Sequence, residues 1–213
     1  MKKAIVPLVF VTLAQVAFAQ EFTPNLHDHN LWYVQNREPS KSTTNGIELN
    51  AGEGDGMMVL KDFDFQDGSI ELDVKGEDKQ GASFVGLAFN IQGEYEYETL
   101  YFRPFNFQNE ARRTHAVQYT YNPDYTWDVL REKYPGKYEN SLEPAPDPND
   151  WFHLRITKIS GKISVYVNNQ PDPCLVVSSL SERDNGMIGL WVGNGSMGEF
   201  KNLKIVLQPT SVN

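Results

Sequence analysis

Three glutamates, Glu94, Glu96 and Glu98, alternate with two tyrosines along a short segment of the chain. Like charges on one face of a β-strand repel one another, so these carboxyl groups need solvent or a partner. Glu98 has the same parity as Leu100 and Phe102, and we therefore expect it to point into the protein. Because burial raises the pKa of a carboxyl group, an inward-pointing glutamate is a candidate general acid or base.

Arg103, Arg112 and His115 follow this segment and could complete an acid–base site. Histidine titrates near neutrality and can act as a general acid or base. Arginine presents several planar donors that can hold sugar hydroxyl groups or a carboxylate. We predict Glu98 and His115 as the catalytic residues, with Arg103 or Arg112 as a partner of the carboxyl group. The structural alternative is that these cations form ion pairs with the many acidic residues of the chain.

Aromatic side chains form a further candidate group, because their rings stack on the apolar faces of sugars. Tyr97 and Tyr101 share one face of a predicted strand, and Trp191 shares a face of another strand with two glycines. Rings beside small residues are typical of the floor of an open groove, which Trp127 could wall. The alternatives are a solvent-facing surface and a second core. The predicted substrate-binding residues are Tyr97, Tyr101, Arg103, Arg112, Trp127 and Trp191.

The spacing of His, Cys, Asp and Glu is not diagnostic of a metal site, and we predict neither a metal site nor a cofactor. The acidic turn Glu53-Gly54-Asp55-Gly56 could chelate Ca²⁺ through oxygen ligands, so a structural calcium ion stays open as an alternative. The single cysteine, Cys174, excludes an internal disulfide and a multi-cysteine metal site.

Strands with period-two alternation must position these residues, and no helical stripe is found between them. Turn signals rich in Gly, Asn and Asp separate the strands at the close spacing of a β-sandwich. We predict an all-β protein, a two-sheet antiparallel jelly-roll sandwich that forms one domain over residues 20–213. The predicted strands cover residues 47–49, 57–60, 69–74, 83–90, 95–105, 116–121, 152–159, 163–168, 175–177, 187–192 and 200–207.

One segment, residues 122–150, lacks any periodicity and contains five prolines. Loops of this length are either functional or disordered. Its aromatic side chains, among them Tyr125, Trp127, Tyr134 and Tyr138, favour a packed insertion over a disordered one.

The first 19 residues have the pattern of a secretory signal peptide. Lys2 and Lys3 precede an apolar stretch that is too short to span a membrane, and Ala17-Phe18-Ala19 is a small-residue cleavage site before Gln20. We therefore expect a secreted or periplasmic protein with no membrane span. The whole chain has 19 basic and 28 acidic residues and a net charge of −9, which argues against nucleic acid and anionic membrane surfaces as partners. The sequence leaves the oligomeric state open.

Four motifs follow one another in the C-terminal half: Trp151-Phe152-His153, Val165-Tyr166-Val167-Asn168, Gly186-Met187-Ile188-Gly189-Leu190 and Phe200-Lys201-Asn202-Leu203-Lys204-Ile205. In this order they resemble the concanavalin A-like lectin and glucanase superfamily, including laminin-G-like domains. Within it, the chain looks like the bacterial 3-keto-disaccharide hydrolase family. The resemblance implies an exported carbohydrate-active protein that binds a glycoside in a concave groove and hydrolyses 3-keto-glycosidic bonds.

Two further functions stay open beside glycoside cleavage. The chain approaches the Glu-x-Asp-x-(x)-Glu strand motif of glucanases at residues 71–77, but Glu77 falls one position too late, which favours ordinary solvent-facing charge. Without an intact carboxylate motif, a non-catalytic glycan-binding module could use the same groove. A cell-envelope interaction protein that docks through the aromatic insertion is the other alternative.

Overall fold

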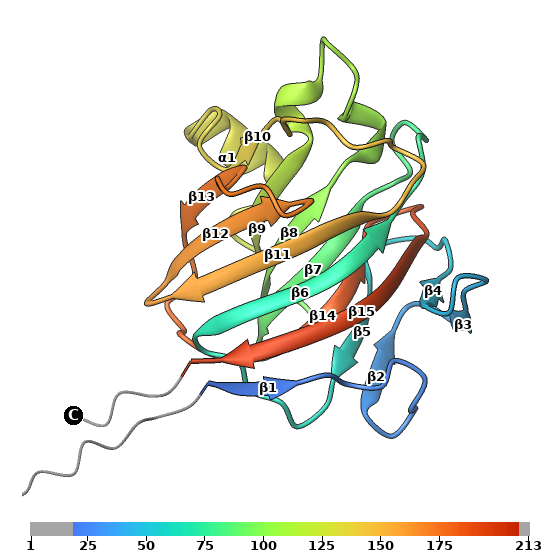
Figure 1. The fold of residues 1–213 in the computed structure, drawn as a ribbon. Helices are drawn as coiled ribbons and strands as arrows, with labels where there is room; N and C mark the ends of the chain where they lie inside the picture. The colour runs from blue at the N-terminus through green and yellow to red at the C-terminus, as the bar shows by residue number, and fades with distance from the viewer. Residues whose placement is uncertain (1–18, 209–213) are drawn as a thin grey trace, which may run out of the picture.

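Two antiparallel β-sheets pack face to face in the computed structural model, which describes residues 19–208 (Figure 1). The predicted all-β, two-sheet antiparallel sandwich is confirmed, and every predicted strand is present. Of the predicted signal peptide, residues 1–18 lie outside the described residues.

One sheet has eight strands: β1 (Gln20–Phe22), β3 (Pro39–Lys41), β4 (Ile47–Leu49), β6 (Gly68–Lys75), β11 (Phe152–Ile159), β12 (Lys162–Val167), β13 (Leu175–Ser178) and β15 (Gly198–Leu207). They are ordered β13-β12-β11-β6-β15-β4-β3, and β1 pairs with β15. Along β6, the buried residues Ile70, Leu72 and Val74 alternate with partly exposed ones. This sheet therefore packs one face on the core and turns the other to solvent.

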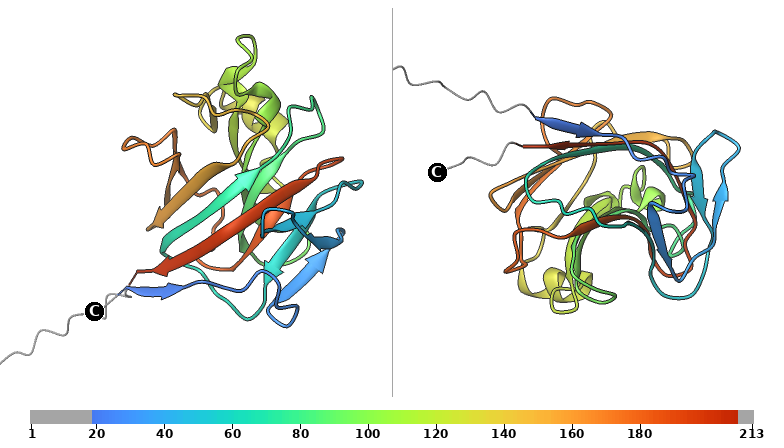
Figure 2. Two further views of the ribbon diagram at one scale, coloured as in Figure 1. Left: turned by 45° about the vertical axis from the view of Figure 1, so that its right-hand side comes forward. Right: turned by 90° about the horizontal axis from the view of Figure 1, so that it is seen from below.

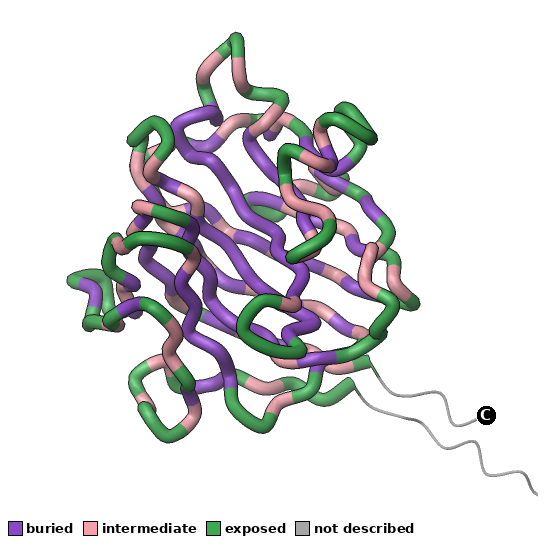
Figure 3. Tube along the Cα trace, turned by 180° about the vertical axis from the view of Figure 1, so that it is seen from behind, coloured by how far each residue is buried: buried purple, intermediate pink, exposed green. Residues whose placement is uncertain are grey.

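The other sheet has seven strands: β2 (Trp32–Gln35), β5 (Gly56–Leu60), β7 (Val85–Ile91), β8 (Tyr97–Phe102), β9 (Val117–Asn122), β10 (Glu139–Asn140) and β14 (Met187–Val192). They are ordered β10-β9-β8-β7-β14-β5-β2. Every residue of β5, β7 and β8 is buried, as Figure 3 shows from the side of this sheet. The sheet curves into an arch (Figure 2, right), and both of its faces are therefore sheltered.

Two apolar clusters occupy the two faces of the seven-stranded sheet. The main core lies between the sheets and includes Leu87, Leu100 and Phe102. The second cluster is smaller and consists of Met57, Val59, Ala88, Ile91, Tyr97, Tyr101 and Trp191. Since successive side chains of a strand point to opposite faces, the same strands supply both clusters, and the second one covers the concave face.

Residues 122–150 contain β10 and a helix, α1 (Trp127–Lys133), which alternation did not predict. The helix begins after Thr126, and Leu130 is its one buried residue. A single buried residue leaves no helical stripe in the sequence. Leu130 and Tyr138 join the main core, so this insertion is packed against the sandwich. Among residues 19–208, no helix is long and apolar enough to cross a membrane.

Two short 3₁₀ helices, η1 (Pro104–Asn106) and η2 (Arg113–His115), lie in the connection between β8 and β9. Residues 95–96 and 103–105, which the sequence assigns to the ends of one long strand, lie outside β8. At the second of these ends, Pro104 lacks a backbone N–H and begins η1 in place of a further strand residue.

A buried polar cluster around Glu98 of β8 links the two sheets. The fully buried Glu98 carboxylate accepts hydrogen bonds from the Tyr119 hydroxyl, from Asn90 Nδ2 at 3.0 Å and from Ser179 Oγ at 2.7 Å. Ser179 follows β13 of the eight-stranded sheet, and the Leu180 N–H donates to the Tyr119 hydroxyl at 2.8 Å. Burial holds the pKa of Tyr119 well above its usual value, so its hydroxyl remains a donor to the carboxylate.

We expect Tyr119→Phe to lower the free energy of unfolding by about 1–3 kcal/mol, because the buried carboxylate loses a donor. Tyr121→Phe is the matched control on the same strand: the Tyr121 hydroxyl reaches Glu96 at 3.4 Å in a partly exposed position, and its removal should cost no more than about 0.5 kcal/mol. Urea unfolding measures both variants. Equal destabilisation by the two changes would contradict a structural role for the cluster.

Candidate functional site

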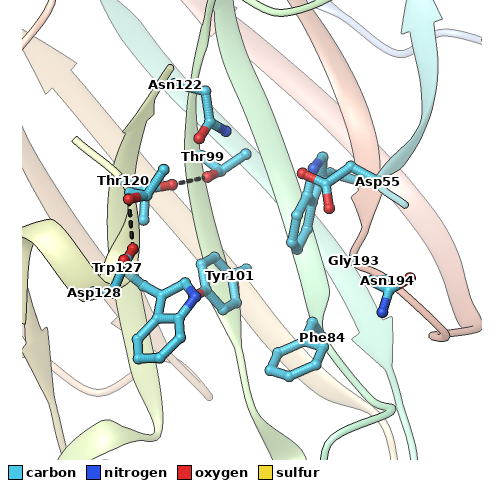
Figure 4. Close-up of a pocket in the computed structure, with 12 residues that line it drawn as sticks. Asp55, Phe84, Thr99, Tyr101, Thr120, Asn122, Trp127, Asp128, Gly193 and Asn194 are labelled. Carbon is cyan, nitrogen blue, oxygen red and sulfur yellow. Dashed lines mark hydrogen bonds between the residues drawn. The ribbon is translucent and has the colours of Figure 1, made fainter. Parts of the chain in front are cut away.

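A hollow of about 300 Å³, the central pocket, opens on the concave face of the seven-stranded sheet (Figure 4). Its floor is formed by Thr99 and Tyr101 of β8, Thr120 of β9 and Trp191 of β14. These residues share one face because alternate residues of neighbouring strands point in the same direction. The volume lies at the lower end of the range for small-molecule sites, so the pocket suits a small ligand.

The floor is largely aromatic. The ring centroids of Tyr101 and Trp191 lie 5.0 Å apart, and each residue is only 4% exposed. The Thr99 and Thr120 hydroxyl groups are hydrogen-bonded to each other beside them. The sequence left open whether this face is the floor of a groove or a second core. The structure combines the two: the rings pack together as a cluster, and part of that cluster lines the pocket.

Asp55 stands on one wall, immediately before β5. Its carboxylate accepts a hydrogen bond from the Tyr97 hydroxyl at 3.0 Å. The buried indole nitrogen of Trp191 lies near the same group and has no aligned partner among the described residues. Burial raises the pKa of the Asp55 carboxyl above its usual value, although Tyr97, Trp191 and the charge of Arg37 act in the opposite direction. Asp55 therefore holds its proton more tightly than a surface carboxyl group.

Arg37 fixes the turn that carries Asp55. Its guanidinium donates to the carbonyl oxygens of Gly52 at 3.2 Å, Gly54 at 2.6 Å and Gly193 at 3.0 Å. The Arg37 guanidinium group therefore occupies carbonyl oxygens of the turn in which the sequence leaves a structural calcium ion open. Among residues 19–208, no group of three or more His, Cys, Asp or Glu side chains is arranged to hold a metal ion.

The start of α1 forms the opposite wall, with Trp127 and Asp128. The Asp128 carboxylate accepts a hydrogen bond from the Thr126 hydroxyl at 2.5 Å. That bond, together with backbone N–H groups of the first helical turn, lowers the pKa of Asp128. Figure 4 shows Asp55 and Asp128 on opposite sides of the floor. Two carboxyl groups with opposite pKa shifts therefore lie across one pocket.

The predicted aromatic binding residues gather around this pocket. Tyr101, Trp127 and Trp191 line it, and Tyr97 hydrogen-bonds the carboxylate on its wall. Trp127 is 48% exposed, and the guanidinium of Arg131 lies 5.0 Å from the centre of its ring.

Arg103, Arg112 and His115 lie instead at a second hollow of about 290 Å³, the basic pocket. Arg103 is almost fully buried and donates to the Tyr101 hydroxyl at 2.7 Å and to the His115 carbonyl oxygen at 3.0 Å. The two hollows share the side chains of Phe84, Tyr101 and Trp127.

His115 is paired with a carboxylate. Such an ion pair is the structural alternative to a catalytic role that the sequence leaves open for this residue. Its Nδ1 atom lies 2.7 Å from Glu139 Oε2, and Arg131 contacts the same carboxylate. Burial alone would raise the pKa of Glu139, but Arg131 and His115 outweigh it, and the pKa is lowered. Glu139 therefore stays ionised beside the basic pocket.

Glu98, which the sequence predicts as a catalytic residue, lies away from the central pocket. Glu98 points into the protein, as alternation predicts, and its oxygens are occupied by the buried cluster described above. The pocket lies on the other face of β8. Glu98 and His115 therefore do not form a common acid–base site.

Sequence reasoning missed both carboxyl groups of the central pocket. Asp55 was considered only as part of a calcium-binding turn, and Asp128 lies in a segment without periodicity. The pair Thr126 and Asp128 is a helix-start signal that could have revealed α1. No local pattern could have placed either carboxylate on the rim of this sheet.

The glucanase-like acidic residues lie elsewhere. Glu71 and Asp73 belong to the solvent-facing positions of β6, and Asp73 Oδ1 lies 2.9 Å from His153 Nδ1 of β11. They are partly exposed charges on the outer face of the eight-stranded sheet, as the sequence predicts, and are remote in the fold from the concave face.

A family model described as the 3-keto-alpha-glucoside-1,2-lyase-like domain matches residues 23–206 of this chain. The match confirms the family resemblance seen in the C-terminal motifs. No curated protein sequence matches the chain.

Solved structures with the same fold include three carbohydrate-related or galectin-like domains. The carbohydrate-binding module CBM66 of Bacillus subtilis is 15% identical, with a TM-score of 0.61 over 82% of this chain and 95% of that one. A Bacillus subtilis protein of unknown function with a galectin-like fold is 13% identical, with a TM-score of 0.58 over 90% and 100%. The VIP36 exoplasmic/lumenal domain, in a form bound to Ca²⁺ and Man3GlcNAc, is 12% identical, with a TM-score of 0.58 over 86% and 86%. At these identities the likeness concerns the fold.

We expect Asp55→Asn to make the protein more stable than the wild type at neutral pH. Burial raises the pKa of Asp55, so its contribution to stability is fully present at acidic pH and is lost as the pH rises through the folded-state pKa. Asparagine cannot ionise, and its side-chain oxygen can still accept the Tyr97 hydrogen bond. Thermal unfolding between about pH 3 and about pH 8 should show a difference in Tm that grows with pH. If the Tm of the wild type instead rises relative to that of the variant as the pH increases, the raised pKa is contradicted.

Proposed function

Since the chain belongs to the 3-keto-alpha-glucoside-1,2-lyase-like domain family, we propose that it binds a 3-keto-α-glucoside in the central pocket and cleaves it by elimination across C1 and C2. The sequence resemblance predicts hydrolysis of the same bond. Elimination followed by addition of water across the new double bond gives the products of hydrolysis, so the two descriptions concern one overall reaction.

The elimination needs one base and one acid. The base removes the proton from C2, which the C3 ketone acidifies because the charge left at C2 spreads onto the ketone oxygen. The electron pair forms a C1=C2 double bond while the C1–O bond breaks and the leaving oxygen takes a proton from the acid. In the chair form of an α-glucoside, the C1–O and C2–H bonds lie on opposite faces of the ring. The base and the acid must therefore stand on opposite sides of the sugar.

Asp55 and Asp128 meet this requirement, and their positions on opposite walls of one pocket are the observation that carries the proposal. Environments that push two carboxyl pKa values apart assign the acid and the base. Asp55, whose pKa is raised by burial, donates a proton to the leaving oxygen. Asp128, whose pKa is lowered mainly by Thr126, stays ionised and accepts the proton from C2.

The floor supplies binding and orientation. Tyr101 and Trp191 offer apolar ring surface to the C–H face of the sugar. The buried indole N–H of Trp191 has no aligned partner within residues 19–208, and Thr120 and Asn122 also line the pocket. These groups can bond sugar hydroxyl groups or the ketone oxygen, which fixes the ring between the two walls.

The direct test is turnover of methyl 3-keto-α-D-glucopyranoside, followed by ¹H NMR. We expect the wild type to release methanol while the H2 signal of the sugar disappears and the anomeric H1 signal is replaced by a vinylic one. Asp55→Asn and Asp128→Asn should each lower kcat by about 10²–10⁴-fold, the usual contribution of a general acid or base. Asp124→Asn is the matched control, because Asp124 is exposed, lies between β9 and α1, and does not line the pocket; its kcat should equal that of the wild type.

Three other outcomes would contradict parts of this proposal. Full turnover in both variants would overturn the acid–base assignment. Release of methanol with H2 retained on the first sugar product would mean direct hydrolysis rather than elimination. Saturable binding of the glycoside without turnover would favour the glycan-binding module considered from the sequence.

We also propose that the protein is exported, on the basis of the signal pattern in residues 1–19. β1 begins at Gln20, the predicted first mature residue, and Gln20 pairs with Leu207 of β15. Cleavage before Gln20 would therefore leave the eight-stranded sheet complete.

N-terminal sequencing of the protein from the periplasm or medium of the producing cells should begin at Gln20. Recovery of a chain that starts at Met1 and remains in the cytoplasm would show that the segment is not a cleaved signal.

A further inference from the structure

The basic pocket is strongly cationic, although the chain as a whole carries a net charge of −9. No aspartate or glutamate lines it. Its charged and titratable lining residues are Arg103, Arg112, Arg131 and His115. A concave site with one sign of charge attracts ligands of the opposite sign.

One neighbouring carboxylate neutralises only part of this charge. Glu139 binds Arg131 in a bidentate manner, with Nε–Oε1 at 3.1 Å and Nη2–Oε2 at 2.7 Å. Arg103 donates to neutral oxygens, those of the Tyr101 hydroxyl, the His115 carbonyl and the Gln118 side chain. Of the three guanidinium groups of this pocket, only that of Arg131 is paired with a carboxylate among residues 19–208, and those of Arg103 and Arg112 form no ion pair there.

Arg112 is the cation best placed to meet a ligand. It is partly buried, and its Nε atom is enclosed by protein without a hydrogen-bond partner in the described part of the chain. Among residues 19–208 it joins none of the ion pairs, and Asp78, which lines the adjoining hollow with it, forms no ion pair to it. A guanidinium presents a planar fork that matches an oxyanion such as a carboxylate or a sulfate.

Asn106 is a second unsatisfied group of the same pocket. It is only 3% exposed, and its Nδ2 atom donates to the His115 carbonyl oxygen at 3.1 Å. Its Oδ1 atom is buried and has no donor among the described residues. A buried acceptor without a partner is costly, and a ligand hydroxyl group would satisfy it. The pocket therefore offers a donor for an oxyanion and an acceptor for a hydroxyl group.

We propose that the basic pocket binds an acidic sugar residue through Arg112 and Asn106, next to the ring in the central pocket. Arg112 takes the oxyanion, a carboxylate or a sulfate ester, and Asn106 takes a hydroxyl group. The shared wall of Phe84, Tyr101 and Trp127 makes the two hollows neighbours along one groove. The inference rests on the proposed function only for the identity of the ring in the central pocket, and it names the substrate class as acidic glycosides.

Calorimetric titration of the mature protein with glucuronic acid, glucose 6-sulfate and glucose tests this directly. We expect at least one of the two acidic sugars to bind about tenfold or more tightly than glucose, the gain of one charge-assisted hydrogen bond. Arg112→Gln should remove that preference, and Arg112→Lys, which keeps the charge without the fork, should keep part of it. Arg113→Gln is the matched control: Arg113 is exposed and pairs with Glu143 at 3.2 Å, so its loss removes the same charge outside the pocket.

If glucuronic acid is the only acidic sugar that binds, the pocket prefers a uronic acid. If both acidic sugars bind, the pocket accepts either a carboxylate or a sulfate ester. Equal affinity for glucose and both acids, or equal losses in Arg112→Gln and Arg113→Gln, would overturn the inference. A preference that is lost only in the Arg112 variant would support it even where methyl 3-keto-α-D-glucopyranoside is not turned over, so the two proposals can fail separately.

Discussion

The candidate site depends on one constraint, the strict alternation of side chains along the curved seven-stranded sheet, which carries an apolar cluster on each face. In β8, Leu100 and Phe102 enter the main core, while Tyr101 faces the concave side. A shift of one residue in the register of such a strand exchanges its two faces, so the apolar core that stabilises the sandwich also fixes the aromatic floor of the pocket. The register of these strands therefore determines both the packing between the sheets and the orientation of the pocket floor.

The walls depend on a different kind of interaction. Arg37 reaches the carbonyl oxygens of the turn before β5 and of Gly193 after β14, and so places Asp55 at one rim of the sheet. Thr126 begins α1 and, through its hydroxyl group, holds Asp128 at the other rim. One carboxyl group is partly desolvated and the other is hydrogen-bonded and exposed, which is why their pKa values move in opposite directions. The chemical asymmetry of the pocket follows from these local environments.

The strands and their faces could be predicted from the sequence because alternation is a local signal. It also predicts correctly that Glu98 points inward, but it could not predict the partners Tyr119 and Ser179, which are distant in the sequence and hold this carboxylate in a buried cluster. The placement of Asp55 depends on contacts such as that between Arg37 and Gly193, which are 156 residues apart. The family motifs identify the fold and the family, whereas the floor and the Asp55 wall of the site come from long-range contacts that no motif contains.

The central claim is that the concave face of the seven-stranded sheet, between Asp55 and Asp128, holds the glycoside. A crystal structure of the Asp55→Asn protein soaked with methyl 3-keto-α-D-glucopyranoside would test it most directly. The account predicts a sugar ring over Tyr101 and Trp191, with its C1 oxygen toward residue 55 and its C2 hydrogen toward Asp128. A ring bound to the outer face of the eight-stranded sheet, or one with both C1 and C2 turned away from these walls, would contradict it.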